Sequence, residues 1–194
     1  MITKSQIRLK RVFDILLALV LIPIILLPLI LFLIIAALET RLSGLFKQDR
    51  VGQYGKTFKI YKIRTLKKGN HELGQLDTYA APFGKFLRHY KLDELPQLFN
   101  VLFGDMSFVG PRPDIVGFAD KLQGEDQIIL KIKPGVTGPA TLKYKDEEAL
   151  FELQDDPENY NRTIIWLDKV EINKKYVRNW SFYLDLKYIV QSIF

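Results

Sequence analysis

Residues 15–38 read ILLALVLIPIILLPLILFLIIAAL, a run without one charged side chain, and this stretch decides how the rest of the sequence is interpreted. About 20 apolar residues are enough for a helix to cross the hydrocarbon core of a bilayer. A secretory signal peptide has a shorter apolar region that ends at a small-residue cleavage site, and no such site follows here. The run predicts a membrane segment in residues 1–40 and a second unit in residues 41–194.

The topology of this segment depends on its prolines and its flanks. Pro23 and Pro28 lie inside the run, and each removes a backbone donor and tends to kink a helix. A spanning helix is expected to show an asymmetry of Lys and Arg between its two ends. Basic residues instead stand on both sides: Lys4, Arg8, Lys10 and Arg11 before the run, and Arg41, Lys47 and Arg50 after it. These facts favour a broken helix that enters and leaves on one face, while a kinked spanning helix also fits the length.

Composition narrows the chemistry that the chain can perform. Cysteine is absent and only His71 and His89 are present, which argues against disulfides, thiolate metal sites, zinc enzymes and a Ser-His triad. The net charge of +6 favours an anionic partner. No aromatic-basic pattern indicates nucleic-acid binding, so we assign the positive charge to membrane lipids and phosphates.

Periodicity in residues 41–194 predicts an α+β domain that is mostly helical with a small β element. Apolar and basic residues alternate over residues 58–63, which predicts a strand, and polar residues 67–81 predict a loop. We expect helices at residues 83–90, from close to Asp93 to Gly104, over much of 115–132, and at 147–153 and 161–177. No internal repeat or interdomain linker is evident.

The last segment, residues 178–194, interleaves aromatic and aliphatic residues with Arg178, Asp185 and Lys187. Aromatic residues beside bases are typical of an interfacial helix in the headgroup layer. A C-terminal helix packed on the core fits the same pattern.

The most informative polar stretch is residues 92–98, LDELPQL. Pro96 is tolerated only in the first turn of a helix, so a helix should begin close to Asp93. The helix dipole would then favour ionised Asp93 and Glu94. Acidic first turns are also common as caps, so the spacing alone favours capping over catalysis. In the catalytic interpretation, Asp93 attacks phosphorus while Glu94 holds a metal or orients the nucleophile.

Residues 110–113, GPRP, place Arg112 between two prolines, which fix the local backbone and can present the guanidinium to a phosphate. A structural ion pair is the alternative. Lys62 and Arg88 add positive charge in the same part of the chain. The acidic residues 146–148 precede an apolar helix and are interpreted as N-terminal caps, and the glycines of residues 135–138 do not have the spacing of a phosphate loop.

Together these stretches resemble the bacterial sugar transferase family, the monotopic phosphoglycosyl transferases. The resemblance covers nearly the whole chain and rests on seven motifs in order: KRVFD (10–14), QDRVG (48–52), YKIRT (61–65), LDELPQLFNV (92–101), GDMSFVGPRP (104–113), KPGVTG (133–138) and WSFYLDLK (180–187). One such motif alone would be a weak signal, but all of them in this order are highly specific.

The resemblance implies an enzyme that moves a sugar-1-phosphate from a UDP-sugar to polyprenyl (undecaprenyl) phosphate and releases UMP, an early membrane step of polysaccharide or glycoconjugate synthesis. It implies Mg²⁺, a nucleophilic Asp93 that becomes a covalent aspartyl-phosphosugar, a metal-binding Glu94, and phosphate-binding roles for Lys62, Arg88 and Arg112. It also implies a re-entrant helix-break-helix over residues 1–40 in the bacterial inner membrane, with a catalytic domain of residues 41–194 on the cytoplasmic face. The sugar, the polyprenol length and the presence of a homodimer stay open.

The sequence departs from the family pattern at three places. The Ser-Pro of the usual helix break is Leu27-Pro28 here. The stretch after Gly138 lacks the Arg that often contacts the nucleotide, for which Lys143 or Lys145 could substitute. Asn173 occupies a position that is often Asp, so we assign no metal ligand there.

Two other functions compete with this one. A membrane glycosyltransferase that transfers sugar without phosphate would release UDP instead of UMP. A non-catalytic membrane scaffold would use Asp93 and Arg112 only structurally and would tolerate Asp93→Asn.

Overall fold

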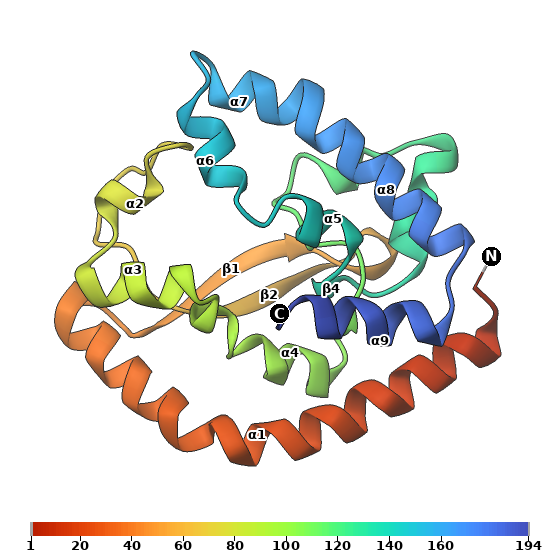
Figure 1. The fold of residues 1–194 in the computed structure, drawn as a ribbon, viewed down its shortest axis with the longest axis horizontal. Helices are drawn as coiled ribbons and strands as arrows, with labels where there is room; N and C mark the ends of the chain where they lie inside the picture. The colour runs from red at the N-terminus through yellow and green to blue at the C-terminus, as the bar shows by residue number, and fades with distance from the viewer. Residues whose placement is uncertain (1, 194) are drawn as a thin grey trace.

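A computed structural model describes residues 2–193 and is dominated by one long helix, α1 (Lys4–Thr40) (Figure 1). Thr3 caps its start by accepting a hydrogen bond from the Gln6 backbone, and Arg41 ends it in the left-handed conformation. The sequence predicts a break near residues 27–28, whereas α1 is helical throughout and curves as an arc along the bottom of Figure 1. Pro23 and Pro28 each remove a hydrogen bond from the helix, and they bend it without ending it.

The outer face of α1 is apolar and exposed. The most apolar part of α1 has a mean hydropathy of 3.3, yet only 11% of it is buried, whereas a core helix of a soluble protein is mostly buried. Leu27 is 78% exposed and Ile24 is 67% exposed. By length and composition, α1 can cross or enter a membrane, and the exposed apolar face supports membrane association.

The inner face of α1 packs on the rest of the chain, chiefly on α4 (Gln97–Phe103), which lies directly above it in Figure 1. Polar side chains near the start of α1 fasten it there. Arg11 donates to the Val101 and Leu102 carbonyl oxygens at 2.5 and 2.8 Å. Asp14, only 2% exposed, accepts from the Ser107 hydroxyl at 3.0 Å and from the Phe108 amide at 3.1 Å.

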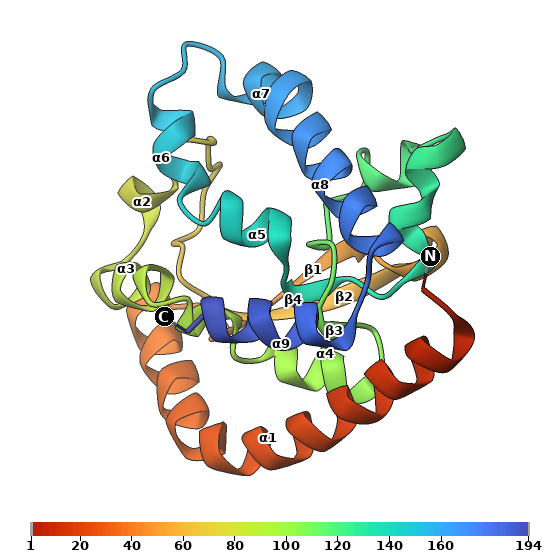
Figure 2. The ribbon, with the colours of Figure 1, turned by 45° about the vertical axis from the view of Figure 1, so that its right-hand side comes forward.

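The far end of α1 is fastened to the same body. Glu39 accepts hydrogen bonds from the Phe83 and Gly84 amides at 3.0 and 3.3 Å, and therefore satisfies the start of α3 (Pro82–His89). Figures 1 and 2 agree that α1 leaves the body at one side and returns to it at the other.

Two short sheets form the β element. Strands β1 (Leu45–Val51) and β2 (Thr57–Ile63) pair antiparallel, with Leu45 opposite Ile63 and Val51 opposite Thr57. Strands β3 (Ser107–Val109) and β4 (Gly135–Thr137) pair in parallel. A Cβ on Gly135 would lie 2.1 Å from the Gly110 nitrogen, so only glycine allows the backbones to approach this closely.

The remaining elements surround these sheets. In chain order they are 3-10 turn η1 (Gln53–Gly55), α2 (Leu76–Tyr79), 3-10 turns η2 (Leu92–Glu94), η3 (Ala119–Lys121) and η4 (Gly124–Lys131), α5 (Pro139–Lys143), α6 (Glu147–Glu152), α7 (Pro157–Tyr160), π-turn η5 (Asn161–Ile165), α8 (Trp166–Arg178) and α9 (Phe182–Gln191). The α+β class with a dominant helical content is confirmed. The helical segment predicted over much of residues 115–132 is present in part, as the 3-10 helices η3 and η4 instead of an α-helix.

The C-terminal helix α9 packs on the core through Asp185. This carboxylate is 1% exposed and accepts hydrogen bonds from Lys10 at 2.5 Å, Tyr176 at 2.6 Å and the Trp180 indole at 3.1 Å. Lys10, which the sequence places among the basic membrane flanks, is only 6% exposed and ties α1 to α8 and α9. Tyr183, on the opposite side of α9, is 73% exposed. A role of α9 at the membrane interface stays a prediction.

Candidate active site

The two predicted carboxylates lie in the 3-10 turn Leu92–Glu94, one turn before α4 begins at Gln97. The helix therefore begins later than the sequence predicts, because Pro96 occupies the cap position of α4. Lys91 precedes the turn in the left-handed conformation, with φ of 55°, which reverses the chain between α3 and the turn. As a result, Asp93 points into the protein and is 7% exposed.

The environment of Asp93 is set by burial. Burial raises the pKa of Asp93 above its ordinary value of 3.8, and the positive charge of Lys62 opposes this rise. The sequence argument expects a helix dipole that favours the ionised form, and this expectation is wrong in direction. A carboxylate with a raised pKa is more basic and hence a better nucleophile once it is ionised.

Glu94 is held by two cations on one of its oxygens. Lys62 Nζ lies 2.8 Å and Arg112 Nη2 lies 2.7 Å from Glu94 Oε1. The Glu94 side chain is 11% exposed. Burial alone would raise the pKa of Glu94, but Arg112 and Lys62 together lower it far below its usual range. Glu94 is therefore a permanent anion in this site.

These cations come from elements that are distant in sequence. Lys62 projects from β2, and Arg112 projects from the loop after β3. Burial lowers the pKa of Lys62 while Glu94 opposes the change, and the negative charge of Glu94 raises the pKa of Arg112. The structure thus brings together Asp93, Glu94, Lys62 and Arg112.

Arg88 is close to this group without joining it. Its Nε donates to Asp77 Oδ1 on α2 at 3.1 Å. Its positive charge nonetheless lowers the pKa of Asp93, which places it within electrostatic reach of the predicted nucleophile. A phosphate that entered beside Asp93 would compete with Asp77 for this guanidinium.

The residues of the acidic run 146–148 do not act as caps. Asp146 makes no capping hydrogen bond at the start of α6. Glu147 pairs with Lys169 of α8, and Glu148 accepts a hydrogen bond from the Leu76 amide at 2.9 Å. The capping interpretation is wrong, because these side chains reach other segments that are remote in sequence.

Three residues at which the sequence departs from the family pattern lie outside the central group: Lys143 and Lys145, which could replace the missing Arg, and Asn173. Lys143 pairs with Asp168 at 2.6 Å, while the carbonyl oxygen of Lys145 accepts from Lys91. Asn173 is 4% exposed on α8, and its Oδ1 has no hydrogen-bond partner among the described residues. Nothing in these contacts makes Asn173 part of the carboxylate group.

Sequence reasoning missed Arg50 and Asp114. Arg50 lies at the end of β1 and donates to the Pro113 carbonyl oxygen at 3.2 Å and to Gln48 at 2.7 Å. Burial lowers the pKa of Arg50 to about 10. Asp114 follows the Pro-Arg-Pro segment, and burial raises its pKa to about 6 against the charges of Lys169 and Arg50. The position of Arg50 in the QDRVG motif was the one feature of the sequence that could have indicated its place near the site. No feature of the sequence indicated Asp114.

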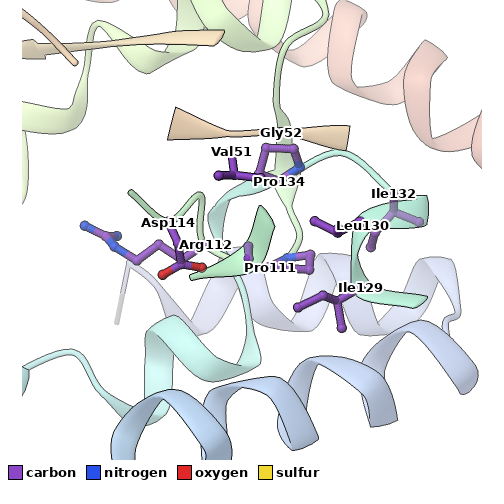
Figure 3. A pocket seen from close by; sticks show the side chains of 10 residues that line it. Val51, Gly52, Pro111, Arg112, Asp114, Ile129, Leu130, Ile132 and Pro134 are labelled. Carbon is purple, nitrogen blue, oxygen red and sulfur yellow. The ribbon is translucent and has the colours of Figure 1, made fainter. Parts of the chain in front are cut away.

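A small cavity of about 20 Å³ lies behind Arg112 and Asp114 (Figure 3). Apolar side chains, among them Ile129, Leu130 and Ile132, line its other side. A single water needs roughly 10–15 Å³ of such volume. The cavity is therefore too small to bind a sugar or a nucleotide.

The residues present fit a Mg²⁺ ion. Proteins often hold Mg²⁺ with one or two carboxylates together with water and substrate phosphates. Glu94 could be such a ligand, because only its Oε1 bonds the two cations and Oε2 has no such bond. Within residues 2–193 no group of three acidic, His or Cys side chains could hold a metal, so substrate oxygens would have to complete the coordination.

Comparison with known proteins identifies the family. The sequence model of the bacterial sugar transferases matches residues 5–194. The uncharacterized sugar transferase EpsL of Bacillus subtilis is 33% identical over 95% of this chain and 85% of its own length. The UDP-glucose:undecaprenyl-phosphate glucose-1-phosphate transferase of Escherichia coli is 33% identical, and the UDP-N-acetylgalactosamine-undecaprenyl-phosphate N-acetylgalactosaminephosphotransferase of Aeromonas hydrophila is 30% identical. The chain is covered to 96% and 95% in these matches but spans only 39% and 43% of those longer proteins. The motifs and the family match together establish that this chain belongs to the bacterial sugar transferase family.

Proposed function

We propose that this chain transfers a sugar-1-phosphate from a UDP-sugar to polyprenyl phosphate and releases UMP. Two relatives are named for this type of reaction with undecaprenyl phosphate. The observation that carries the proposal is the buried Asp93 next to Glu94 in sequence. One carboxylate oxygen of Glu94, Oε1, forms salt bridges with both Lys62 and Arg112. A nucleophilic anion, a second anion and two cations in one site are what an attack on a diphosphate requires.

In the first half-reaction, an oxygen of Asp93 would bond to the phosphorus that carries the sugar. The bond from this phosphorus to the bridging oxygen breaks, and UMP leaves with that oxygen. In the second half-reaction, an oxygen of polyprenyl phosphate attacks the same phosphorus and releases Asp93 as a carboxylate. No proton has to be removed from either nucleophile, which suits a site without histidine.

The cations counter the repulsion between a carboxylate and a diphosphate. Lys62 and Arg112 already lie within hydrogen-bond distance of Glu94, so their charge is concentrated beside Asp93. The fork of Arg112 can bind two phosphate oxygens at once. Arg88 would exchange Asp77 for a phosphate oxygen. Glu94 would hold a Mg²⁺ ion, which would supply positive charge that counters the negative charge of the donor diphosphate and of the UMP leaving group.

We also propose that α1 is re-entrant in the bacterial inner membrane, with the catalytic domain on the cytoplasmic face. Its start is bonded to the body through Lys10, Arg11 and Asp14, and its end through Glu39. A spanning helix would place these two ends on opposite sides of the bilayer, and one folded body could not hold both. The continuous bend supports an arc that dips into one leaflet.

The test is to incubate the purified full chain with UDP-sugars and polyprenyl phosphate and to identify the nucleotide product. UMP is expected, and release of UDP would establish the rival glycosyltransferase reaction. Asp93→Asn should abolish turnover, whereas Asp49→Asn, which removes only an exposed ion pair with Lys59, should not. Unchanged activity in Asp93→Asn, or no nucleotide release from the wild type with any donor, would refute the proposal and favour a scaffold.

The covalent step has its own test. With a labelled donor and no lipid acceptor, the label should appear on Asp93 after digestion and mass spectrometry. A label on Glu94 or on another residue would exclude Asp93 as the nucleophile.

A further inference from the structure

The loop that carries Arg112 is held to the rest of the protein through its backbone carbonyl oxygens. The Pro111 carbonyl oxygen accepts a hydrogen bond from the Gly135 amide at 2.8 Å, and the Asp114 carbonyl oxygen accepts one from the Val51 amide at 2.9 Å. Both prolines of the loop lack an N–H group, so the loop offers its neighbours mainly carbonyl oxygens. The position of the Arg112 side chain therefore depends on the donors that reach these oxygens.

Arg50 supplies a third donor, and this one comes from a side chain. Its Nη1 donates at 3.2 Å to the carbonyl oxygen of Pro113, the residue that follows Arg112. Gln48 lies two residues earlier on the same face of β1, and its Oε1 accepts from Arg50 Nη2 at 2.7 Å. The guanidinium is thereby fixed between its own strand and the loop.

The end of β1 packs against this loop. Val51, Pro111, Arg112 and Asp114 line the same small cavity (Figure 3). The Arg50 side chain and the Val51 amide belong to successive residues of the strand, and they bond two successive carbonyl groups of the loop. This double attachment fixes both the position and the direction of the backbone that leaves Arg112.

An arginine is costly at this position if it serves stability alone. Burial lowers the pKa of Arg50 to about 10, so the guanidinium stays charged at neutral pH although it is partly buried. Its Nε is buried and has no hydrogen-bond partner among the residues that the structure describes. A buried donor without a partner costs free energy, and departures of this kind are expected at functional sites. The contacts of Arg50 therefore favour a functional reason for its presence.

We propose that Arg50 is a positioning residue, which holds the loop of residues 110–114 so that the Arg112 guanidinium faces Glu94 and the donor phosphate. This inference rests on the proposed function and adds to it the residue that orients the phosphate-binding arginine. The fork of Arg112 binds two phosphate oxygens only in a narrow range of orientations, so a small shift of the loop would weaken it. A lysine at the same place would be less sensitive, because its ammonium is a point charge on a flexible stem.

A double-mutant cycle separates positioning from a general loss of stability. It measures kcat/KM for UMP release with the best UDP-sugar in the wild type, Arg50→Gln, Arg112→Lys and the double variant. Arg50→Gln should lower kcat/KM roughly 10-fold or more in the wild type. In the Arg112→Lys background the same change should lower it by less than about 3-fold, because no fork remains to be oriented. Arg50→Lys, which can still donate to the Pro113 carbonyl oxygen, should recover part of the loss.

The matched control is Arg64→Gln. Arg64 also donates to a backbone carbonyl oxygen, that of Ser43 at 2.7 Å, but at the opposite end of the β1–β2 hairpin. This variant should keep kcat/KM within about twofold of the wild type. Hydrogen exchange gives a readout that needs no turnover, since residues 110–114 should exchange faster in Arg50→Gln and not in Arg64→Gln. If Arg50→Gln does not fold, Gln48→Ala, which removes only the bond that orients Arg50, should show the same pattern with smaller losses.

Three results would overturn the inference. Equal fold-losses from Arg50→Gln in the wild type and in the Arg112→Lys background would mean that Arg50 acts independently of Arg112. A lower Tm with unchanged kcat/KM would mean that Arg50 only stabilises the fold, and unchanged exchange of residues 110–114 would mean that it does not hold the loop. Absence of UMP from any donor with the wild type would instead refute the proposed function, while the exchange experiment would still report on the loop.

Discussion

The buried ion pair between Lys10 and Asp185 predicts a large and specific loss of stability in Asp185→Asn. The change keeps the shape of the side chain but turns one oxygen into an NH₂ group. That oxygen accepts from Lys10 at 2.5 Å, and both Asp185 oxygens accept from the Trp180 indole at 3.1 Å. The variant would leave an ammonium that is 7% exposed at its side chain without its hydrogen-bonded counter-ion.

The magnitude follows from this burial. Removing one partner of a buried pair costs about 3–5 kcal/mol, because the remaining charge loses the partner that offset its removal from water. For a chain of this size, 1 kcal/mol corresponds to roughly 2–4 °C in Tm. Asp185→Asn should therefore lower Tm by roughly 6–20 °C. The loss should weaken the contact between α1 and α9, to which Lys10 contributes the ion pair with Asp185.

Thermal unfolding of the full chain in detergent, followed by circular dichroism at 222 nm, measures the effect. Asp49→Asn is the matched control, since its ion pair with Lys59 has side chains that are 61% exposed and should contribute less than about 1 kcal/mol. The double variant Lys10→Met with Asp185→Leu should recover most of the loss, because apolar replacements remove the need for charge pairing. Equal Tm values for Asp185→Asn and Asp49→Asn would refute the reasoning.

Four further results are expected. Arg112→Lys keeps the charge but loses the fork, so kcat/KM for the donor should fall by about one to two decades; equal kcat/KM would make Arg112 structural. Glu94→Gln removes the anion that Lys62 and Arg112 hold, so the Mg²⁺ concentration for half-maximal rate should rise about tenfold or more, as titration would show. The pKa of Asp114 in the folded protein, about 6, lies above its ordinary value of 3.8, so ionisation of Asp114 lowers the free energy of unfolding as the pH rises through this range. Asp114→Asn should therefore raise the free energy of unfolding by as much as about 3 kcal/mol at pH 8 and by little at pH 4. Thermal unfolding at the two pH values measures this difference. Single cysteines at Lys4 and Lys47, in a chain without native cysteine, should both resist an impermeant thiol reagent in intact cells, and labelling of one alone would indicate a spanning helix.

Local sequence patterns were sufficient for the elements that depend on local rules. The apolar run predicts α1, the spacing of residues 83–90 predicts α3, and Gly104 ends α4 in the left-handed conformation, as expected. Four of the five predicted site residues lie together in the structure. They could be predicted because they belong to motifs whose roles the family resemblance supplies. Asp93 in isolation would have fitted capping equally well.

Long-range partners could not be read from periodicity. Strand β1 has no strong alternation, and it forms because β2 offers a hydrogen-bonding edge. Lys10 resembles any membrane-flanking base, and only the fold brings it to Asp185. Asp114 carries no motif of its own, and two of the cations whose charges act on it, Arg50 and Lys169, come from segments remote in sequence.

Because α1 is attached to the body at both ends, the number of residues between the two attachments sets both the distance between them and their relative orientation around the helix axis. Each inserted residue rotates everything beyond it by about 100° and lengthens the helix by about 1.5 Å. A single insertion between Asp14 and Glu39 would keep the hydropathy of the segment yet turn one anchor away from its amides. Insertions of about seven residues nearly restore the phase, but they lengthen the arc by roughly 10 Å between anchors that stay in place. The length of this apolar membrane segment is therefore constrained by the two attachment points on the rest of the protein.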